Sequence, residues 1–298
     1  MEEFQEIENQ PVKEKEKKRN PFKLFGIILI LLGILFYLYI HFIEPNMLVT
    51  HEYAIIDNNL PYSFHGIKIV HFSDILYGST MNEKKLEKMV TKINQLKPDI
   101  LVFTGDLFNS TIQLNDDAKN KLKEVLSKLT ATYKKYAVIG DNDYIDKNSY
   151  MEIMESANFM ILNNKSDLFY YGGNDPLLFL GTNSLLEKEN DIEMANTNYE
   201  DISSAYKIWL NHEPIILDEL LNRFVKPNLI LAGHTLKGLM PLPFGGTLLK
   251  QNGVENYESV YYNKQDVKMY ISSGLGTYKY NARFLNPPSI NLYRLYQY

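Results

Sequence analysis

The sequence of 298 residues contains no cysteine. This excludes disulfide bonds, thiolate nucleophiles and cysteine-based zinc sites. The chain also has no excess of positive charge. Its formal net charge at pH 7 is −5, so we expect no nucleic-acid partner. An apolar content of 45% and a charged content of 22% are typical of an ordinary folded protein. We therefore look for a functional site among the histidine and carboxylate side chains.

One segment lacks charge altogether. Residues 24–43 read LFGIILILLGILFYLYIHFI, without Asp, Glu, Lys or Arg. A helix rises about 1.5 Å per residue, so this length covers the roughly 30 Å hydrocarbon core of a bilayer. We expect a transmembrane helix; a cleaved signal peptide and a buried core helix are the alternatives. The run exceeds the usual h-region of about 7–15 residues, no A-x-A-like site follows it, and core helices are rarely apolar all round.

The charges that flank this segment predict its orientation. None of the residues 44–67 is Lys or Arg, whereas six basic residues precede the span: Lys13, Lys15, Lys17, Lys18, Arg19 and Lys23. The positive-inside rule then predicts a single-pass protein of the cell membrane, with residues 1–23 in the cytoplasm and the rest extracytoplasmic. Residues 2–20 alternate Glu-rich and Lys-rich stretches, which is typical of disorder. Because no repeat or low-complexity linker follows, residues 44–298 are predicted to form one domain.

The first half of this domain alternates strand and helix. Strands are expected at 67–72, 99–104 and 136–140, and apolar residues recur at helical spacing between them, over 86–93 and 118–129. Such an order predicts parallel pairing with right-handed crossovers. The second half has one expected helix, between His212 and Phe224, and more strands, at 168–171, 177–180, 206–210, 228–232, 247–250, 267–272 and 289–296. We expect two packed sheets with helices outside them.

An aspartate or a histidine follows each of five predicted strands. These residues are Asp74, Asp106, Asp141 with Asn142 and Asp143, His212, and His234. In open α/β sheets, ligands bind beyond the carboxyl ends of strands. Each aspartate alone is compatible with a turn residue or a helix N-cap, but recurrence after five strands favours a site. Histidines with carboxylates suit Zn²⁺, Mn²⁺, Fe²⁺ or Mg²⁺.

The order of these motifs resembles that of the calcineurin-like metallophosphoesterases, which read D-x-H, G-D, G-N-H-D/E, H-x-P and G-H-x-H. The resemblance runs through residues 67–240. The segments PLPFGGTLLKQNGVENYES (241–259) and MYISSGLGTYKYNARFLNPPSINLYRL (269–295) are similar to the bacterial membrane-anchored branch. The resemblance implies an α/β fold, a four-layer sandwich of two mixed β-sheets flanked by helices. It also implies a hydrolase acting on phosphate ester bonds.

The ligand set that the family uses for its first metal is incomplete here. The matching positions are Asp74, Leu76, Asp106 and Leu236. Leucine has no lone pair to offer a metal, so Leu76 and Leu236 mark lost ligands and Asp74 remains from a residual first site. We expect no second metal ion in this protein.

The ligand set of the other metal is kept. Its positions are Asp106, Asp141, His212 and His234, with Asp141 in place of the family's asparagine. A carboxylate oxygen can ligate as well as an amide oxygen, and its charge should strengthen the attraction for a cation. We expect one divalent metal, Mn, Zn, Fe or Mg. Without any metal, these two aspartates, Asp74 and Asp143 would face one cavity and raise one another's pKa.

The catalytic histidine of the family is replaced by Asn142, so no catalytic residue is assigned. Asparagine cannot supply a proton, and losing general acid catalysis typically costs about 10²–10⁴ in rate. His71 should point to the opposite face of its strand, and Glu213 is expected to be a solvated neighbour. Lys237 is either an exposed lysine or a contact for a bound phosphate.

Two main functional hypotheses follow, with an unrelated structural or adhesion domain as a third. The first is a membrane-anchored relative with a degenerate dinuclear site, either weakly active or a non-catalytic protein that binds a phosphorylated or lipid-linked ligand. The second is an active single-metal phosphoesterase that hydrolyses phosphomonoesters or phosphodiesters at the cell envelope. Fold alone does not decide between them.

Overall fold

The computed structural model describes residues 21–78, 80–111, 114–197, 205–236, 241, 256–277 and 281–298. The predicted strand at 247–250 and Lys237 lie outside the described residues. The chain divides into two compact units, with the boundary between Tyr39 and Ile40. We describe each unit by itself.

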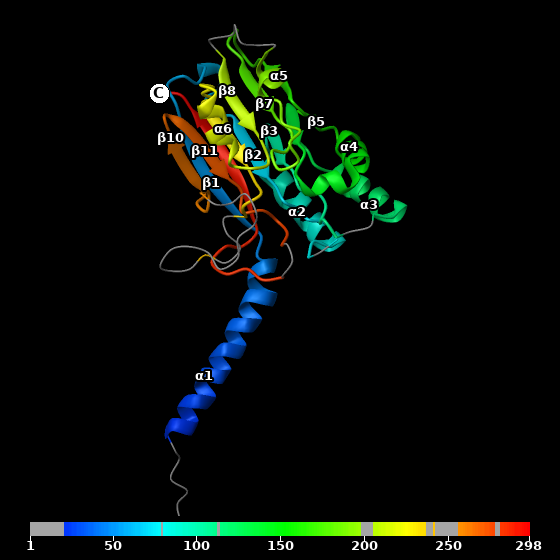
Figure 1. Cartoon of the computed structure of the whole chain (residues 1–298), viewed down its shortest axis with the longest axis vertical. Helices are drawn as coiled ribbons and strands as arrows, with labels where there is room; N and C mark the ends of the chain where they lie inside the picture. Colours follow the sequence, from blue (N-terminus) through cyan, green and yellow to red (C-terminus); the bar gives the residue numbers. More distant parts are fainter. Residues whose placement is uncertain are drawn as a thin grey trace, which may run out of the picture. The chain divides into compact units, whose positions relative to one another are not determined.

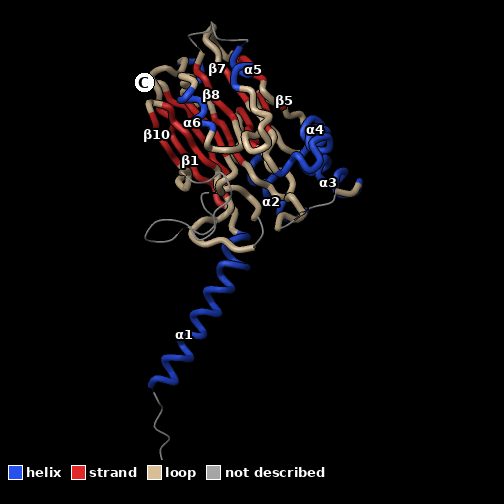
Figure 2. Tube along the Cα trace, in the orientation of Figure 1, coloured by secondary structure: helices blue, strands red, loops and turns tan. Residues whose placement is uncertain are grey.

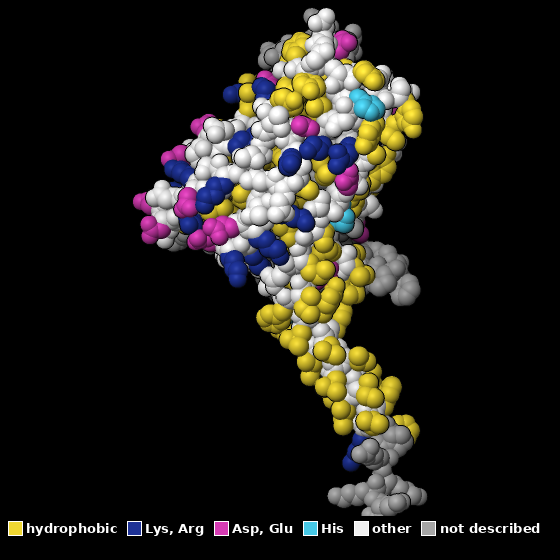
Figure 3. Space-filling model, turned by 180° about the vertical axis from the view of Figure 1, so that it is seen from behind, with side chains coloured by type: hydrophobic (Ala, Val, Ile, Leu, Met, Phe, Trp, Pro, Cys, Tyr) yellow, Lys and Arg dark blue, Asp and Glu magenta, His cyan; other side chains and the backbone are white. Residues whose placement is uncertain are grey.

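The N-terminal unit contains helix α1, Pro21–Leu38. The chain continues as a π-helix, Tyr39–Ile43, and a 3₁₀ turn, Glu44–Asn46. Residues Phe22–Asn46 are long and apolar enough to cross a membrane, with a hydropathy of 2.5. The large apolar side chains of α1 are exposed and are drawn in yellow in Figure 3. Only 6% of the most apolar window of this segment is buried within the structure.

The second unit contains two six-stranded sheets, drawn in red in Figure 2. The first sheet has the order β1 (Val49–Ile56), β12 (Ser289–Tyr296), β2 (Lys68–Phe72), β3 (Ile100–Thr104), β4 (Lys134–Val138) and β5 (Met160–Ile161). The second has the order β10 (Tyr261–Lys264), β11 (Val267–Ile271), β9 (Leu229–Ala232), β8 (Tyr206–Leu210), β7 (Leu177–Gly181) and β6 (Lys165–Phe169). Strands β2, β3 and β4 pair in parallel, as predicted. Both sheets are mixed, since β12–β2, β10–β11 and β6–β7 are antiparallel.

Helices pack on the outer faces of the two sheets. Figure 1 shows α2 (Glu83–Gln95), α3 (Asp116–Leu126) and α4 (Lys147–Ser156) together on one side of the strands. These three helices pack on the first sheet, and α5 (Ile192–Thr197) and α6 (Ile216–Asn222) pack on the second. The predicted four-layer α/β sandwich is therefore confirmed.

The alternation of side chains along the strands builds this layering. In β3, Leu101 and Phe103 join the core under α2–α4, whereas Ile100 and Val102 join the core between the sheets. Successive side chains of a strand point to opposite faces. A strand that is buried on both faces therefore reads as a continuous apolar run. This arrangement leaves the loops at the strand ends to carry the polar groups.

Candidate metal centre

Four loops bring two carboxylates and two imidazoles together. Asp106 follows β3, Asp141 follows β4, His212 follows β8 and His234 follows β9. One oxygen or nitrogen from each lies within 4.8 Å of the others. The first sheet thus contributes both carboxylates and the second sheet both imidazoles. The structure assembles the four residues that the family resemblance assigned to one metal.

The distances between these atoms suit a shared cation. His212 Nε2 lies 3.1 Å from Asp141 Oδ1 and 3.3 Å from Asp106 Oδ2. His234 Nδ1 lies 3.2 Å from both Asp141 Oδ1 and His212 Nε2. Ligands held about 2.1 Å from a tetrahedral ion stand roughly 3.4 Å apart. The donor atoms are therefore spaced as ligands of one ion would be.

The orientation of His212 and the environment of Asp141 also suit a shared cation. His212 Nδ1 donates a hydrogen bond of 2.6 Å to the main-chain oxygen of Thr104. This bond fixes the tautomer of the neutral ring, in which the lone pair of Nε2 faces the carboxylates and would be free for a cation. Asp141 Oδ1 is buried, and among the described residues no donor is aligned for a hydrogen bond to it. Such an oxygen is costly to bury, and a cation would satisfy it.

Burial and mutual charge shift the pKa values of this cluster. Burial raises the pKa of Asp141, but His212 and His234 lower it by more than burial raises it. The pKa therefore lies below its usual value, and the group stays ionised. Burial lowers the pKa of His212, yet the carboxylates raise it well above its usual value. For Asp74, burial dominates and raises the pKa to about 6. The three shifts have the physical causes expected where several ionisable groups share a desolvated site.

Five residues other than glycine at the site have a left-handed backbone conformation. Asp74, Leu76, Asp106, His234 and Leu236 all have φ between 48° and 63°. This left-handed region is uncommon for residues other than glycine, and strained residues cluster at functional sites. The two leucines keep this conformation although they offer no ligand. The loops therefore hold the same shape on both sides of the site.

The side that carries the two leucines is apolar. Leu76 and Leu236 have no exposed surface. Leu236 packs so closely on Gly274 (φ +66°) that a Cβ atom there would lie 2.0 Å from Leu236 Cδ2. Between this apolar side and the four-residue cluster lies Asp74, whose Oδ1 is 4.0 Å from His212 Nε2. Asp74 Oδ2 accepts from His234 N at 3.2 Å.

Two expectations about single residues are wrong. Asp143 does not face the cavity, because its carboxylate accepts four main-chain N–H bonds, from Asp106, Leu107, Phe108 and Gly140. It shapes the turn that presents the ligands. Glu213 is not solvated. It is fully buried and accepts hydrogen bonds from Ser184 Oγ and Leu185 N.

Asn142 contacts Asp106, one of the four residues of the cluster. Its main-chain N donates to Asp106 Oδ1 at 3.0 Å, and its side-chain amide donates to Asp106 Oδ2. Asn142 therefore orients the carboxylate that would ligate the metal. The spacing of residues in the sequence did not predict that Asn142 would orient Asp106.

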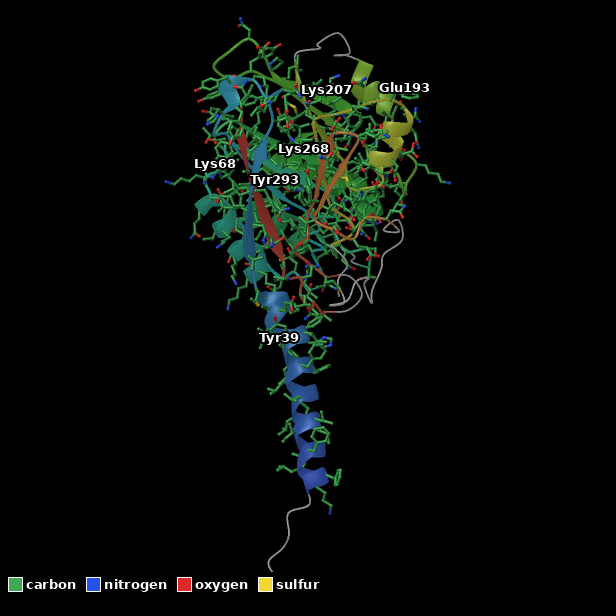
Figure 4. The ribbon with its side chains drawn as sticks, turned by 90° about the vertical axis from the view of Figure 1, so that its left-hand side faces the viewer. Tyr39, Lys68, Glu193, Lys207, Lys268 and Tyr293 are labelled. Atoms are coloured by element: carbon green, nitrogen blue, oxygen red, sulfur yellow. The ribbon has the colours of Figure 1, made fainter. Side chains whose placement is uncertain are left out.

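His71 lies in the core between the sheets. Its ring contacts Thr104 Oγ1 at 2.8 Å and the hydroxyl of Tyr293 at 3.3 Å. Tyr293, on β12, is labelled in Figure 4 and lies among the strands. Burial lowers the pKa of His71 to about 3, so the ring is neutral. The expected placement on the face opposite the site loop holds.

Sequence reasoning missed Arg283, which braces the loop beside Asp74. Its guanidinium is fully buried and donates to four main-chain oxygens, those of Ser273, Gly274, Gly276 and Asn286. Leu275 N and Gly276 N in turn bond Asp74 O. Neither charge pattern nor periodicity singled out this arginine within the tail segment.

Comparison with known proteins identifies the family of this chain. Residues 67–238 match the model of the calcineurin-like phosphoesterase family. The chain is 30% identical over 270 residues to the uncharacterized metallophosphoesterase YkuE of Bacillus subtilis, covering 87% of this chain and 89% of that relative. It is 25% identical over 321 residues to the UDP-2,3-diacylglucosamine pyrophosphatase LpxG of Chlamydia muridarum, covering 88% and 93%.

A solved structure, the protein TT1561 of Thermus thermophilus, aligns over 70% of this chain and 90% of its own, with 12% identity and a TM-score of 0.44. The family model spans more than half of the chain and contains all five strand ends of the site. The chain belongs to the calcineurin-like phosphoesterase family.

Proposed function

We propose that this protein is a membrane-anchored, extracytoplasmic phosphoesterase-fold protein that holds one divalent cation and binds a phosphorylated ligand, with two-metal hydrolysis lost. One observation carries the proposal: the donors of Asp106, Asp141, His212 and His234 lie within 4.8 Å of one another, whereas the other half of the site presents buried leucines. The first half can hold a cation and the second cannot.

The residues present fit a single divalent ion. Two carboxylates and two imidazoles balance a charge of +2, and nitrogen with oxygen ligands suits Zn²⁺, Mn²⁺ or Fe²⁺. When bound, such an ion supplies a Lewis acid for a phosphate oxygen. Asn142 keeps Asp106 in place, but no imidazole stands where the family has its proton donor. The site is therefore built to bind a phosphate ester more than to cleave it.

The class of ligand follows from the anchor and from one relative. The name of LpxG identifies a pyrophosphatase of UDP-2,3-diacylglucosamine, which is a lipid-linked diphosphate. An N-terminal helix that can cross a membrane would hold the present site near lipid-linked substrates. We therefore place lipid-linked phosphates first among the candidate ligands.

Metal analysis of the full chain tests the cation site. We expect about one equivalent of Mn²⁺, Zn²⁺ or Fe²⁺ in the detergent-purified wild type after exhaustive dialysis. We expect a clear loss in His234→Ala and none in His65→Ala, which changes an exposed histidine outside the site. A metal-free wild type that also takes up no added ion would refute the proposal.

Hydrolysis of aryl phosphomonoesters and phosphodiesters tests the lost catalysis. We expect little turnover by the wild type and a gain in Leu76→His/Asn142→His/Leu236→His, which restores the family's residues. Metal-dependent turnover by the wild type, abolished by Asp106→Ala, would instead establish the second candidate, a single-metal phosphoesterase. That candidate is favoured by the complete second donor set, in which Asp141 adds a charge.

A further inference from the structure

A pocket of about 460 Å³ opens on the second unit beside helix α2. It is lined by residues 45–48, by Met81 and the first turns of α2, and by Leu275 and Pro288. This volume lies in the range of small-ligand pockets. None of the four residues of the metal centre lines it.

The interior of the pocket is apolar. Met81, Met89 and Leu275 are buried and belong to the core under α2–α4, and Leu48 packs against the same core. Met47 is 42% exposed and forms an apolar part of the wall. The pocket can therefore cover hydrocarbon as well as a polar group.

Three lysines, Lys84, Lys85 and Lys88, make the rest of the lining basic, and no Asp or Glu lines the pocket. None of the three forms an ion pair with a carboxylate of the described residues. Lys88 Nζ donates to Asn46 O at 3.3 Å. Burial lowers the pKa of Lys85, and the charges of Arg283 and Lys88 lower it further. The pocket thus carries positive charge that no described carboxylate balances.

The same charge is visible on the surface. Figure 3 shows Lys and Arg side chains gathered at the lower edge of the domain, on the side where α2 lies. Isolated surface lysines are ordinary, but three at one apolar pocket form a complement for an anion with a hydrocarbon part.

The position of the pocket in the sequence narrows the choice of anion. Pro45 and Asn46 line the pocket and are also the last residues of the candidate span Phe22–Asn46. The lining therefore begins at the residues where the candidate span ends, and a membrane-spanning helix would hold these residues near the lipid headgroups. Lysines beside a membrane-spanning helix attract anionic lipids.

We infer that this pocket binds the headgroup of an anionic membrane phospholipid. The three lysines contact the phosphate, and the methionines with Leu275 cover the glycerol and the first acyl carbons. The site is independent of the metal centre. Main-chain hydrogen bonds link it to that centre, since Leu275 N donates to the main-chain oxygens of Ser73 and Asp74.

Native mass spectrometry of the full chain tests this inference. The protein is released from nonionic detergent micelles that contain equal amounts of phosphatidylglycerol and phosphatidylcholine. We expect the wild type to retain one phosphatidylglycerol in preference to phosphatidylcholine. Lys84→Gln/Lys85→Gln/Lys88→Gln should reduce that retention by roughly tenfold or more.

Matched variants separate the pocket from general charge. Lys97→Gln/Lys165→Gln/Lys188→Gln removes three exposed lysines elsewhere and should retain the lipid like the wild type. Met47→Asp should weaken retention, because it places a negative charge on the wall. His234→Ala should leave retention unchanged even if it loses metal. Each variant is first checked for a wild-type melting temperature.

Three results would overturn the inference. The first is equal retention of both lipids by the wild type. The second is undiminished retention by the Lys84/Lys85/Lys88 variant. The third is release of the lipid by an equal concentration of inorganic phosphate or of a short acidic peptide, which would reassign the pocket to a soluble anion.

Discussion

At the scale of single residues, Asp141 supplies one of the two negative charges of the candidate metal centre. With Asp106 it gives the four-residue cluster a charge of −2, which a divalent cation neutralises. An asparagine at this position would leave an oxygen ligand but only one negative charge. Histidines 212 and 234 already hold the pKa of Asp141 below its usual range, so the carboxylate is ionised wherever a metal could bind.

Replacing Asp141 therefore has a graded effect on metal affinity. We expect Asp141→Asn to weaken binding of Mn²⁺ by roughly tenfold, and His234→Ala to weaken it more, because the amide keeps an oxygen ligand. Competition with a chelating dye measures both constants. Equal affinity of Asp141→Asn and the wild type would show that the charge of Asp141 does not contribute to metal binding.

Gly140 is a second residue of interest, because there is no room for a side chain at its position. A Cβ atom there would lie 2.2 Å from Asp106 Oδ1 and 2.4 Å from Asp106 N. We expect Gly140→Ala to displace Asp106, destabilise the protein by about 1–3 kcal/mol, and reduce its metal content. Gly173→Ala is the control, since its Cβ would meet no atom closer than 3.4 Å. Urea unfolding and metal analysis of both variants check this, and unchanged stability and metal content in Gly140→Ala would contradict it.

At the scale of elements, the strands of the first sheet bury the imidazole of His71. His71 on β2 contacts Thr104 on β3 and Tyr293 on β12. Its pKa is lowered to about 3 by burial, against about 6.5 in an unfolded chain. Between these values the unfolded state binds the proton and the folded state does not, so stability falls as the pH falls below about 6.5.

His71→Gln should reduce this dependence on acid. Between pH 7 and pH 5 we expect the wild type to lose about 2 kcal/mol more free energy of unfolding than the variant. The carboxylates of the metal centre titrate alike in both proteins, so the difference isolates His71. Urea unfolding of the full chain in detergent measures it, with the exposed His65→Gln as control. Parallel pH profiles of the wild type and His71→Gln would exclude the assigned shift.

Most central elements could be predicted from the sequence because burial on both faces leaves a clear apolar run. The strands that became β2, β3, β8 and β9 have this pattern. The missed elements are of another kind: β1, β5, β10, α4 and α5 lie at edges or carry many polar residues. In addition, β6 begins at Lys165, three residues before the prediction, because only part of it is buried.

The candidate ligand positions could be predicted because each stands two or three residues after the end of a strand. The residues that support them could not. Asp143, Asn142 and Arg283 act through hydrogen bonds to main-chain atoms or to a ligand from another loop. Those contacts depend on the path of the backbone, which no spacing of residue types encodes.

At the scale of the whole molecule, the described residues form two separate candidate binding sites. The metal centre lies where strands of both sheets end, and the lysine-lined pocket lies beside residues 45–48. A chain that is anchored through residues just before that pocket would present both places to the same compartment. The charges before residue 24 predict the side of the membrane on which this compartment lies.

The absence of cysteine makes this orientation directly testable, because any single introduced cysteine is the only thiol in the chain. The positive-inside rule predicts residues 1–23 in the cytoplasm. We expect Ser127→Cys, at an exposed position of the domain, to react with a membrane-impermeant maleimide in intact cells. Gln5→Cys should react only after the cells are permeabilised, and the cysteine-free chain should never react. If Gln5→Cys were labelled in intact cells and Ser127→Cys were protected, the domain would lie in the cytoplasm, and the proposal of an extracytoplasmic ligand would be wrong.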